Sequence, residues 1–175
     1  MDNPNRPEYQ RAKFYTQDRR CTIVARLGFS LDGVVLQADR QSAIKSFERE
    51  RSYWMERDVY LRLREHQVVQ ISGHAVPQML DHDDKLRVIE MSIVQPPYIL
   101  DFAKSQLDFP PDFPDHVMSE RYAHWAELFE DRWPKVVAIM RELEKRCGIY
   151  LFDPNPRNIT FPPDQTELDY TIRVQ

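Results

Sequence analysis

The sequence predicts an α+β protein of two small lobes, in which a five-stranded antiparallel sheet with one helix precedes a reduced helical lobe. Short runs rich in β-branched and apolar residues fill the first half of the chain and alternate with turn-prone residues. A stretch without glycine or proline, with apolar residues at helical spacing, interrupts these runs. Two further helical stretches follow a proline-rich break, which separates them from the sheet.

The first lobe is expected over residues 20–94, and residues 1–19 are expected to form an N-terminal arm. This opening segment contains Pro4, Pro7 and several charges but no sustained periodicity. We therefore expect it to lie against the domain without joining the core, and the fold to begin near Arg20. The first three strands are predicted at Cys21–Leu27, Gly33–Ala38 and Ser42–Phe47.

Residues 47–64 are predicted to form the helix of the first lobe. Trp54, Val59, Tyr60 and Leu63 fall on one face of such a helix. An acidic turn over residues 81–84 is expected to join the last two strands of the lobe. These strands are predicted at Val76–Leu80 and Leu86–Met91.

The second lobe is expected over residues 95–175. Clustered prolines break regular structure at its start and again over residues 108–114. Two helices are predicted beyond them, at His116–Phe129 and Pro134–Arg146. Pro134 suits the first turn of the second helix, and Gly148 suits its C-terminal stop.

Composition argues against several classes of function. The net charge of −4 over 175 residues, with both signs mixed along the chain, provides no basic stripe for a nucleic acid. No apolar stretch is long enough to cross a bilayer and no signal peptide is seen, so we expect a cytoplasmic protein without a membrane partner. Cys21 and Cys147 are far apart, and we expect both to be reduced thiols.

A glycine-containing segment, Gly28-Phe-Ser30-Leu-Asp-Gly33-Val-Val35, lies between the first two predicted strands. No helix follows it, which excludes the dinucleotide-binding and Walker A loops, because both run directly into a helix. The segment resembles the Gly-rich loop of protein kinases, G-x-G-x-x-G-x-V, with Ser30 in place of the middle glycine. Taken alone it also fits an ordinary β-turn. The resemblance implies that Gly28, Ser30, Gly33 and Val35 line an ATP site.

Ala43-Ile-Lys45, on the third predicted strand, resembles the V-A-I-K lysine of the same family, which holds the α- and β-phosphates. A lysine on a buried strand is costly unless its charge is paired. The resemblance implies a glutamate partner on the following helix, and we choose Glu56, which opens a segment that resembles the family's αC helix. The alternatives on the chain are Glu48, Glu50 and Glu65.

Residues 86–92 resemble the fifth strand of the kinase lobe, which runs into the hinge, with Ile89 as gatekeeper. The resemblance implies that the backbone around Glu90 and Ser92 faces the adenine ring. A plain buried strand is an equally good interpretation of these residues.

Asp153-Pro-Asn-Pro-Arg-Asn158 follows the last predicted helix and resembles the kinase catalytic loop, H-R-D-L-x-x-x-N. A simple turn is the alternative. The resemblance implies that Asp153 orients or deprotonates an acceptor hydroxyl and that Asn158 holds Mg²⁺ or Mn²⁺. Downstream, Leu168-Asp169-Tyr170 resembles the D-F-G segment, which implies that Asp169 is the principal metal ligand.

The chain departs from the family in two places. Leu151 and Phe152 replace the His and Arg before the catalytic aspartate, which argues against control by an activation-loop phosphate. Only residues 171–175 follow the D-F-G-like segment, so we expect no activation loop and no platform for a peptide substrate.

These motifs predict a minimal kinase-like phosphotransferase that uses ATP with Mg²⁺ or Mn²⁺. Lys45 and Asp153 are its expected catalytic residues, and its acceptor is an unidentified hydroxyl, which could belong to the chain itself. The alternative is a pseudokinase, a nucleotide-binding regulatory module. A third interpretation is a protein-interaction module on an inherited kinase-like fold.

Aromatic residues gather on the two helices of the second lobe. They are expected to form its core, and any part that stays exposed would bind a protein partner or a second copy of the chain. These residues are Tyr122, Trp125, Phe129 and Trp133.

Overall fold

A computed structural model describes residues 5–30, 32–95 and 99–162 of the chain. The helices are α1 (Pro7–Asp18), α2 (Glu50–Glu65), α3 (Asp115–Phe129) and α4 (Trp133–Cys147), with a 3-10 turn, η1 (Glu130–Arg132), between the last two. The strands are β1 (Ile23–Ser30), β2 (Gly33–Ala38), β3 (Ser42–Phe47), β4 (Gln70–Ile71), β5 (His74–Ala75), β6 (Met79–Asp83), β7 (Val88–Ser92), β8 (Ser105–Leu107) and β9 (Ile149–Leu151).

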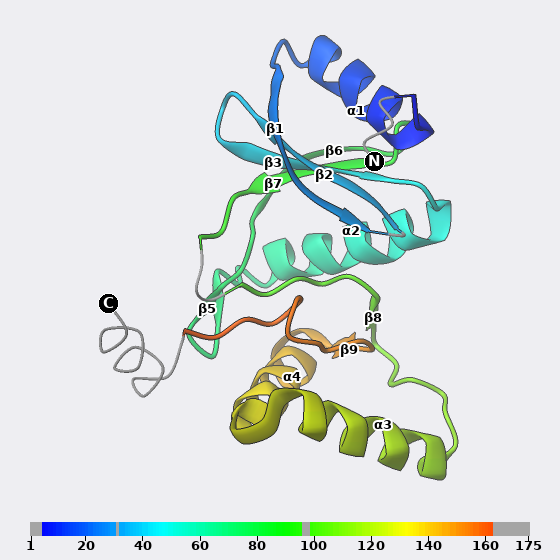
Figure 1. Cartoon of the computed structure of the whole chain (residues 1–175), viewed down its shortest axis with the longest axis vertical. Helices are drawn as coiled ribbons and strands as arrows, with labels where there is room; N and C mark the ends of the chain where they lie inside the picture. The colour runs from blue at the N-terminus through cyan, green and yellow to red at the C-terminus, as the bar shows by residue number, and fades with distance from the viewer. Residues whose placement is uncertain (1–4, 31, 96–98, 163–175) are drawn as a thin grey trace, which may run out of the picture.

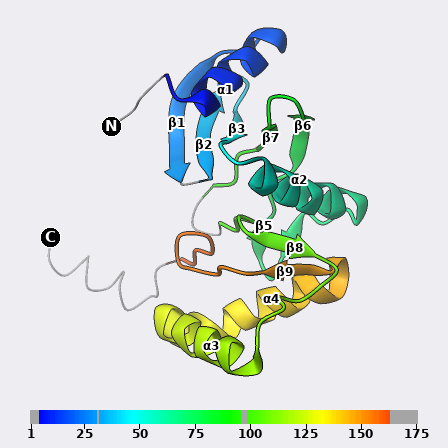
Figure 2. The same ribbon diagram turned by 90° about the vertical axis from the view of Figure 1, so that its right-hand side faces the viewer.

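The predicted α+β class and the five-stranded antiparallel sheet are confirmed, with the strands in the order β1-β2-β3-β7-β6. Figure 1 shows α1 on one face of this sheet and α2 on the other. Helices α3 and α4 form the opposite end of the molecule, and β8 and β9 lie between them and α2 in both Figure 1 and Figure 2. Among the described residues, no helix is long and apolar enough to cross a membrane.

Side-chain alternation divides β3 between the two faces of the sheet. Ala43 and Phe47 join the core cluster on the side of α2, whereas Ile44 joins the cluster on the side of α1. Since successive residues of a strand point to opposite faces, Lys45 shares the α2 face with Ala43 and Phe47. The whole strand is buried because helices cover both faces.

The prediction that residues 1–19 form an arm outside the core is wrong, because α1 spans most of this segment. Ala12 and Tyr15 are fully buried in the core cluster on the α1 face. The Tyr15 hydroxyl lies within hydrogen-bond distance of two carboxylates, Glu90 Oε2 at 2.8 Å and Asp81 Oδ2 at 2.9 Å. The helix buries few apolar residues and meets polar groups of the sheet, so its sequence shows no clear apolar stripe.

The acidic turn expected over residues 81–84 is also placed differently, because His82 and Asp83 continue β6 and pair with Ile89 and Val88 of β7. The turn follows at residues 84–87. There the Asp83 carboxylate accepts hydrogen bonds from two backbone N–H groups, those of Lys85 and Leu86. An aspartate that bonds the backbone two or three residues onward favours such a turn at the end of a strand.

Helix α2 joins the two halves of the described chain. One buried apolar cluster includes Phe47 from the sheet, Tyr60 from α2 and Ile139 from α4, so the core is continuous between the lobes. At the end of α2, the Arg62 guanidinium donates to both oxygens of Asp108, at 2.8 and 2.9 Å, and to the Cys147 carbonyl at 2.9 Å. These bonds hold α2 against the C-terminal end of α4.

The two helices predicted for the second lobe are confirmed within a few residues of their expected bounds. Pro134 lies in the first turn of α4, and Gly148 ends the helix in the left-handed conformation at φ +62°. Both placements follow the expected preferences of proline and glycine. Cys21 and Cys147 are free and buried, as expected for reduced thiols.

Gly33→Ala is expected to destabilise the protein by about 2 kcal/mol or more. An ideal Cβ at Gly33 would lie 2.1 Å from the backbone oxygen of Ser46, and the φ of +151° strains any L side chain. Gly28→Ala is the matched control, because its Cβ meets nothing closer than Val35 Cβ at 4.0 Å. Urea unfolding followed by circular dichroism measures both, and equal midpoints would contradict the steric account of Gly33.

Candidate functional site

A row of paired residues crosses the sheet and brings three predicted site residues together. Gly28 of β1 pairs with Val35 of β2, Val35 pairs with Lys45 of β3, and Lys45 pairs with Ile89 of β7. Directly paired residues of neighbouring antiparallel strands point to the same face. The register therefore places Gly28 and Val35 beside Lys45.

Lys45 and Glu56 form the ion pair that the sequence predicts. The Lys45 amine donates to both carboxylate oxygens of Glu56, at 2.6 and 2.8 Å, and both side chains are buried. Glu56 lies on the buried face of α2, which also carries Tyr53 and Tyr60. The choice of Glu56 as the partner of Lys45 is confirmed, and its role in ligand binding stays a prediction.

A second carboxylate, which sequence reasoning missed, also contacts Lys45. Asp101 Oδ1 lies 3.5 Å from the Lys45 amine. The Asp101 side chain is 38% exposed, compared with 4% for Glu56, so the amine bridges a dry carboxylate and one that reaches solvent. Glu56 holds the lysine within the protein, and Asp101 lies on its accessible side.

Burial and the neighbouring charges shift the pKa values of Lys45 and Glu56. Burial raises the pKa of Glu56 above its ordinary value; the charge of Lys45 opposes this rise and that of Asp101 adds to it. Burial also acts to lower the pKa of Lys45, but Asp101 and Glu56 together raise it above its ordinary value. Lys45 is therefore a permanent cation that lies between two carboxylates.

The loop predicted to be catalytic, residues 153–158, is held by its own amide side chains. Asn155 Nδ2 and Asn158 Nδ2 both donate to the Asp153 carbonyl, at 3.0 and 3.1 Å. In the side chain of Asn158, the amide oxygen is the polar atom that this bond does not use. The Asp153 carboxylate, 39% exposed, accepts a hydrogen bond from the Lys104 amine at 2.8 Å.

Backbone pairing connects this loop to Lys45 through Asp101. The Asp101 N–H donates to the Asn158 carbonyl at 2.8 Å. Leu100 forms an antiparallel bridge with Ile159, and the Thr160 N–H donates to the Ile99 carbonyl at 3.0 Å. Farther out, β8 pairs antiparallel with β9. The segment around Asp101 thus lies between the sheet and the loop that holds Asp153 and Asn158.

The predicted position of Glu90 beside an adenine ring is wrong. Glu90 lies in the interior of β7, where it is paired with Ile44 of β3 on one side and with Asp81 of β6 on the other. Its buried carboxylate lies on the α1 face, where it accepts hydrogen bonds from Tyr15, Arg40 and Ser42. This is the face opposite to Lys45, because neighbouring residues of a strand alternate.

Ser92 is also placed within the sheet rather than along an open edge. It pairs with Ser42, and its N–H donates to the Gln78 carbonyl at 2.9 Å. Its hydroxyl accepts a hydrogen bond from the Gln78 N–H at 2.8 Å. Because its N–H is already bonded, the backbone of Ser92 is not available to donate a hydrogen bond to an adenine ring.

The remaining expected residues of the glycine-containing segment lie at the end of the β1–β2 hairpin. Ser30 pairs with Gly33 there. Position 33 requires glycine, because a Cβ at this position would collide with the backbone oxygen of Ser46. The Asp32 carbonyl accepts a hydrogen bond from the Glu48 N–H at 2.9 Å, which fixes the hairpin near the start of α2. Asp169, the expected metal ligand, lies outside the described residues.

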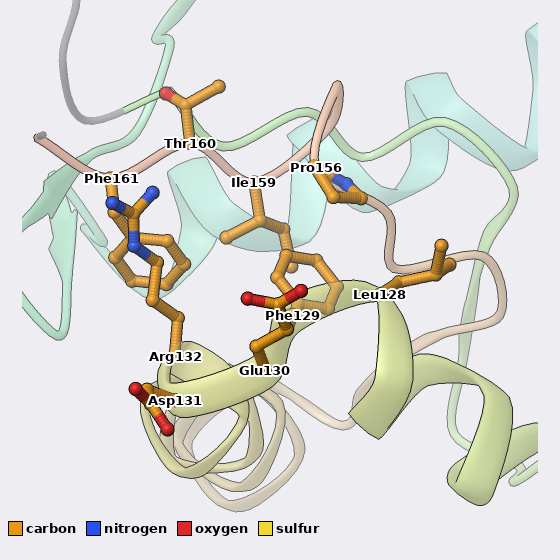
Figure 3. A pocket seen from close by; sticks show the side chains of 9 residues that line it. All are labelled: Leu128, Phe129, Glu130, Asp131, Arg132, Pro156, Ile159, Thr160 and Phe161. Carbon is orange, nitrogen blue, oxygen red and sulfur yellow. The ribbon is translucent and has the colours of Figure 1, made fainter.

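Within the described residues, cavities of about 490, 400 and 520 Å³ lie in the second half of the chain, and neither Lys45 nor Glu56 lines these cavities. In one, of about 490 Å³, the loop residues Pro156, Ile159 and Phe161 face the turn between α3 and α4 (Figure 3). Glu130 of this turn has φ +48°, an uncommon backbone state for a side-chain-bearing residue. We place the site at Lys45, because a lysine held by one buried and one solvent-accessible carboxylate is positioned to bind an anion.

The aromatic residues of the second lobe cluster as expected, but they are unequally buried. Trp125 and Phe129 are buried, whereas Tyr122 is 42% exposed. The Tyr122 and Trp125 rings meet edge to face, and Trp133 packs near both. The binding of a partner or a second copy to this surface stays a prediction.

Comparison with known proteins does not identify this chain. No protein-family model matches it, and no curated protein does so either. The case for its function therefore depends on the residues around Lys45 and on the sequence motifs that carry the resemblance.

Proposed function

We propose that the chain is a kinase-like ATP-binding phosphotransferase, in which Lys45 holds the phosphates and the loop 153–158 faces the acceptor. The observation that carries this proposal is the buried Lys45–Glu56 ion pair, whose amine also reaches the exposed carboxylate of Asp101. A helix after the third strand of a five-stranded sheet also fits the arrangement that the resemblance implies.

A buried ion pair is weak evidence of a contribution to stability, because its desolvation cost can exceed the Coulombic gain. Strongly perturbed ionisable groups next to an accessible edge are, however, typical of functional sites. Lys45 is fixed by Glu56 on its buried side and contacts solvent-facing Asp101 on the other. This arrangement suits a lysine that is held in place to bind an anion.

The donor atoms near Lys45 fit a hard divalent cation only if the nucleotide supplies further ligands. Among the described residues, no group of three or more His, Cys, Asp or Glu side chains could hold a metal ion. Mg²⁺ in nucleotide sites takes one or two carboxylates together with phosphate oxygens and water. The amide oxygen of Asn158 and a neighbouring carboxylate would provide the protein's share, and the cation would neutralise phosphate charge.

The proposed reaction transfers the γ-phosphoryl group of ATP to a hydroxyl. The acceptor oxygen forms a bond to the γ-phosphorus, the bond from that phosphorus to the β–γ bridging oxygen breaks, and ADP leaves. Asp153 orients the hydroxyl and accepts its proton. Its exposed carboxylate can reach an acceptor in solvent, and the Lys104 amine holds one of its oxygens in place.

ATP with Mg²⁺ is expected to raise the melting temperature. A ligand that binds only the native state adds about 2.7 kcal/mol at 100 times its Kd, which is roughly 5–10 °C for a domain of this size. Thermal-shift titration measures it, with ATP and EDTA as the metal-free arm. The absence of any response to ATP, with or without metal, would overturn the proposal.

Gly28→Ala tests whether the nucleotide contacts the glycine-containing segment, because the structure leaves room for the added methyl in the unliganded protein. The unliganded protein should melt within a few degrees of wild type, whereas the ATP-induced shift should fall, since glycine allows close approach of backbone to a ligand. Lys85→Met, at an exposed turn on the sheet, removes a lysine away from the site and should keep the full shift.

The second candidate is a nucleotide-binding regulatory module without turnover. The Lys104–Asp153 ion pair favours it, because one oxygen of the proposed acceptor-orienting carboxylate is already engaged. Both candidates predict the same ATP-dependent stabilisation, and they differ only in phosphate transfer.

A further inference from the structure

Asp101 lies where the carboxylate of a nucleotide-bound cation is needed, although it precedes the loop 153–158 in the chain. Its Oδ1 atom is 3.5 Å from the Lys45 amine, and its N–H donates to the carbonyl of Asn158 at 2.8 Å. Asp101 thus contacts Lys45 through its side chain and Asn158 through its backbone.

Neighbouring contacts fix the backbone at this position. The Ala103 N–H donates to Asp101 Oδ1 at 3.1 Å, and the Ser105 N–H donates to the Phe102 carbonyl at 3.0 Å. Phe102 is fully buried and meets the ring of Tyr60 on α2 edge to face, with centroids 5.6 Å apart. A side chain between a buried aromatic anchor and a paired backbone is preorganised, which favours a ligand-binding role.

Charge balance at the lysine calls for a cation. Lys45 carries one positive charge, and Glu56 and Asp101 carry two negative charges when both are ionised. A phosphate that approaches Lys45 would therefore meet an excess negative charge, which opposes its binding. A divalent cation between Asp101 and the phosphate oxygens would remove this repulsion, and the Asp101 side chain, which is 38% exposed, is accessible to such a cation.

The local sequence agrees with this position. Leu100-Asp101-Phe102 places an aspartate between an apolar residue and an aromatic residue, as does Leu168-Asp169-Tyr170. Sequence reasoning selected the second segment because of its position after the catalytic loop. Asp101 precedes the loop 153–158 in the sequence but lies beside it in space, because backbone hydrogen bonds hold residues 99–101 against residues 158–160.

We infer that Asp101 holds the divalent cation of a nucleotide bound at Lys45, together with the amide oxygen of Asn158. This inference rests on the proposed nucleotide site and adds the identity of its metal carboxylate. It assigns the role to a segment between the sheet and α3, before the catalytic-like loop, so the order of the motifs along the chain differs from that of the family it resembles.

The test compares Asp101→Asn with Asp169→Asn, which makes the same chemical change at the position chosen from chain order. Asparagine retains the oxygen that accepts from Ala103, so the turn at residue 101 should persist. The melting temperature is measured with ATP and EDTA and with ATP and Mg²⁺. The affinity for Mn²⁺ at saturating ATP is measured by electron paramagnetic resonance.

Asp101→Asn should keep the metal-free response to ATP and weaken Mn²⁺ affinity by about 100-fold, since even outer-shell partners of a metal are worth roughly 10–100-fold. Asp101→Glu should recover part of this loss. Loss in Asp101→Asn supports the inference, whether or not Asp169→Asn also loses affinity. Unchanged Mn²⁺ affinity in Asp101→Asn overturns it, and if Asp169→Asn alone loses affinity the nucleotide site itself survives.

A measurement on the wild-type protein covers the case in which Asp101→Asn fails to fold. Mn²⁺ with ATP should broaden the backbone amide signals of residues 101–103 in a heteronuclear NMR spectrum, because a bound paramagnetic ion relaxes nearby nuclei. Sharp signals for these residues at saturating Mn²⁺ and ATP would overturn the inference. A wild-type protein that shows no response to ATP in any arm would instead overturn the proposed function and this inference with it.

Discussion

Asp153→Asn is expected to leave ATP affinity nearly unchanged and to slow phosphate transfer by about 10²–10⁴-fold, the usual cost of losing a positioned general base. The Asp153 carboxylate is paired with Lys104, whereas Lys45 is paired with Glu56 and Asp101. The phosphate-holding lysine and the acceptor-facing carboxylate thus have separate partners. A change at Asp153 should therefore affect the rate and spare binding.

Radiolabelled phosphate release and incorporation, at saturating ATP and Mg²⁺, measure this effect. Asp112→Asn, at an exposed loop position, is the matched control and should turn over at the wild-type rate. Equal rates for wild type and Asp153→Asn would mean that Asp153 has no catalytic role. A wild-type protein that binds ATP but transfers no phosphate without an added partner would favour the regulatory module.

Lys45→Met is expected to destabilise the protein by about 3–5 kcal/mol, because it leaves the Glu56 carboxylate buried without its partner. The side chains of both residues are almost completely buried, so little solvent screening reduces the penalty. Urea unfolding gives the free energy. A loss below about 1 kcal/mol would show that Glu56 readily becomes neutral or finds another partner.

The double variant Lys45→Met/Glu56→Met separates stability from function. Replacing a buried ion pair by apolar side chains of similar volume is often neutral or stabilising, so this variant should recover most of the lost free energy. It should nevertheless fail to respond to ATP. Recovery of stability together with a retained ATP response would remove Lys45 from the nucleotide site.

Local patterns in the sequence predicted most of the sheet and the helices of the second lobe. Alternating and β-branched residues predicted the five strands, and the apolar spacing from Trp54 to Leu63 predicted α2. Helix α1 was missed because its buried face relies on Tyr15, whose hydroxyl lies within hydrogen-bond distance of two carboxylates of the sheet. Such a face shows no apolar stripe until the surface beneath it is known.

The sequence likewise predicted some residues of the site correctly and misplaced others. Lys45 could be identified from the sequence because a lysine within a buried strand needs a partner, and Glu56 falls on the buried face of the next helix. Glu90 and Ser92 were misplaced, because the sequence does not indicate which strands flank β7 on either side. The two-residue strands β4 and β5 and the three-residue strands β8 and β9 are too short to produce a periodic signal.

The sequence alone determined the α+β class, the strand that carries Lys45, the helix that carries Glu56, and the spacing of Asp153 and Asn158, because each depends on residues close together in the chain. Only the tertiary structure decided that Asp101 reaches Lys45 and that α1 covers Glu90. Both depend on pairing between distant segments. The free energy of such pairing comes from burial and backbone hydrogen bonds that no local pattern records.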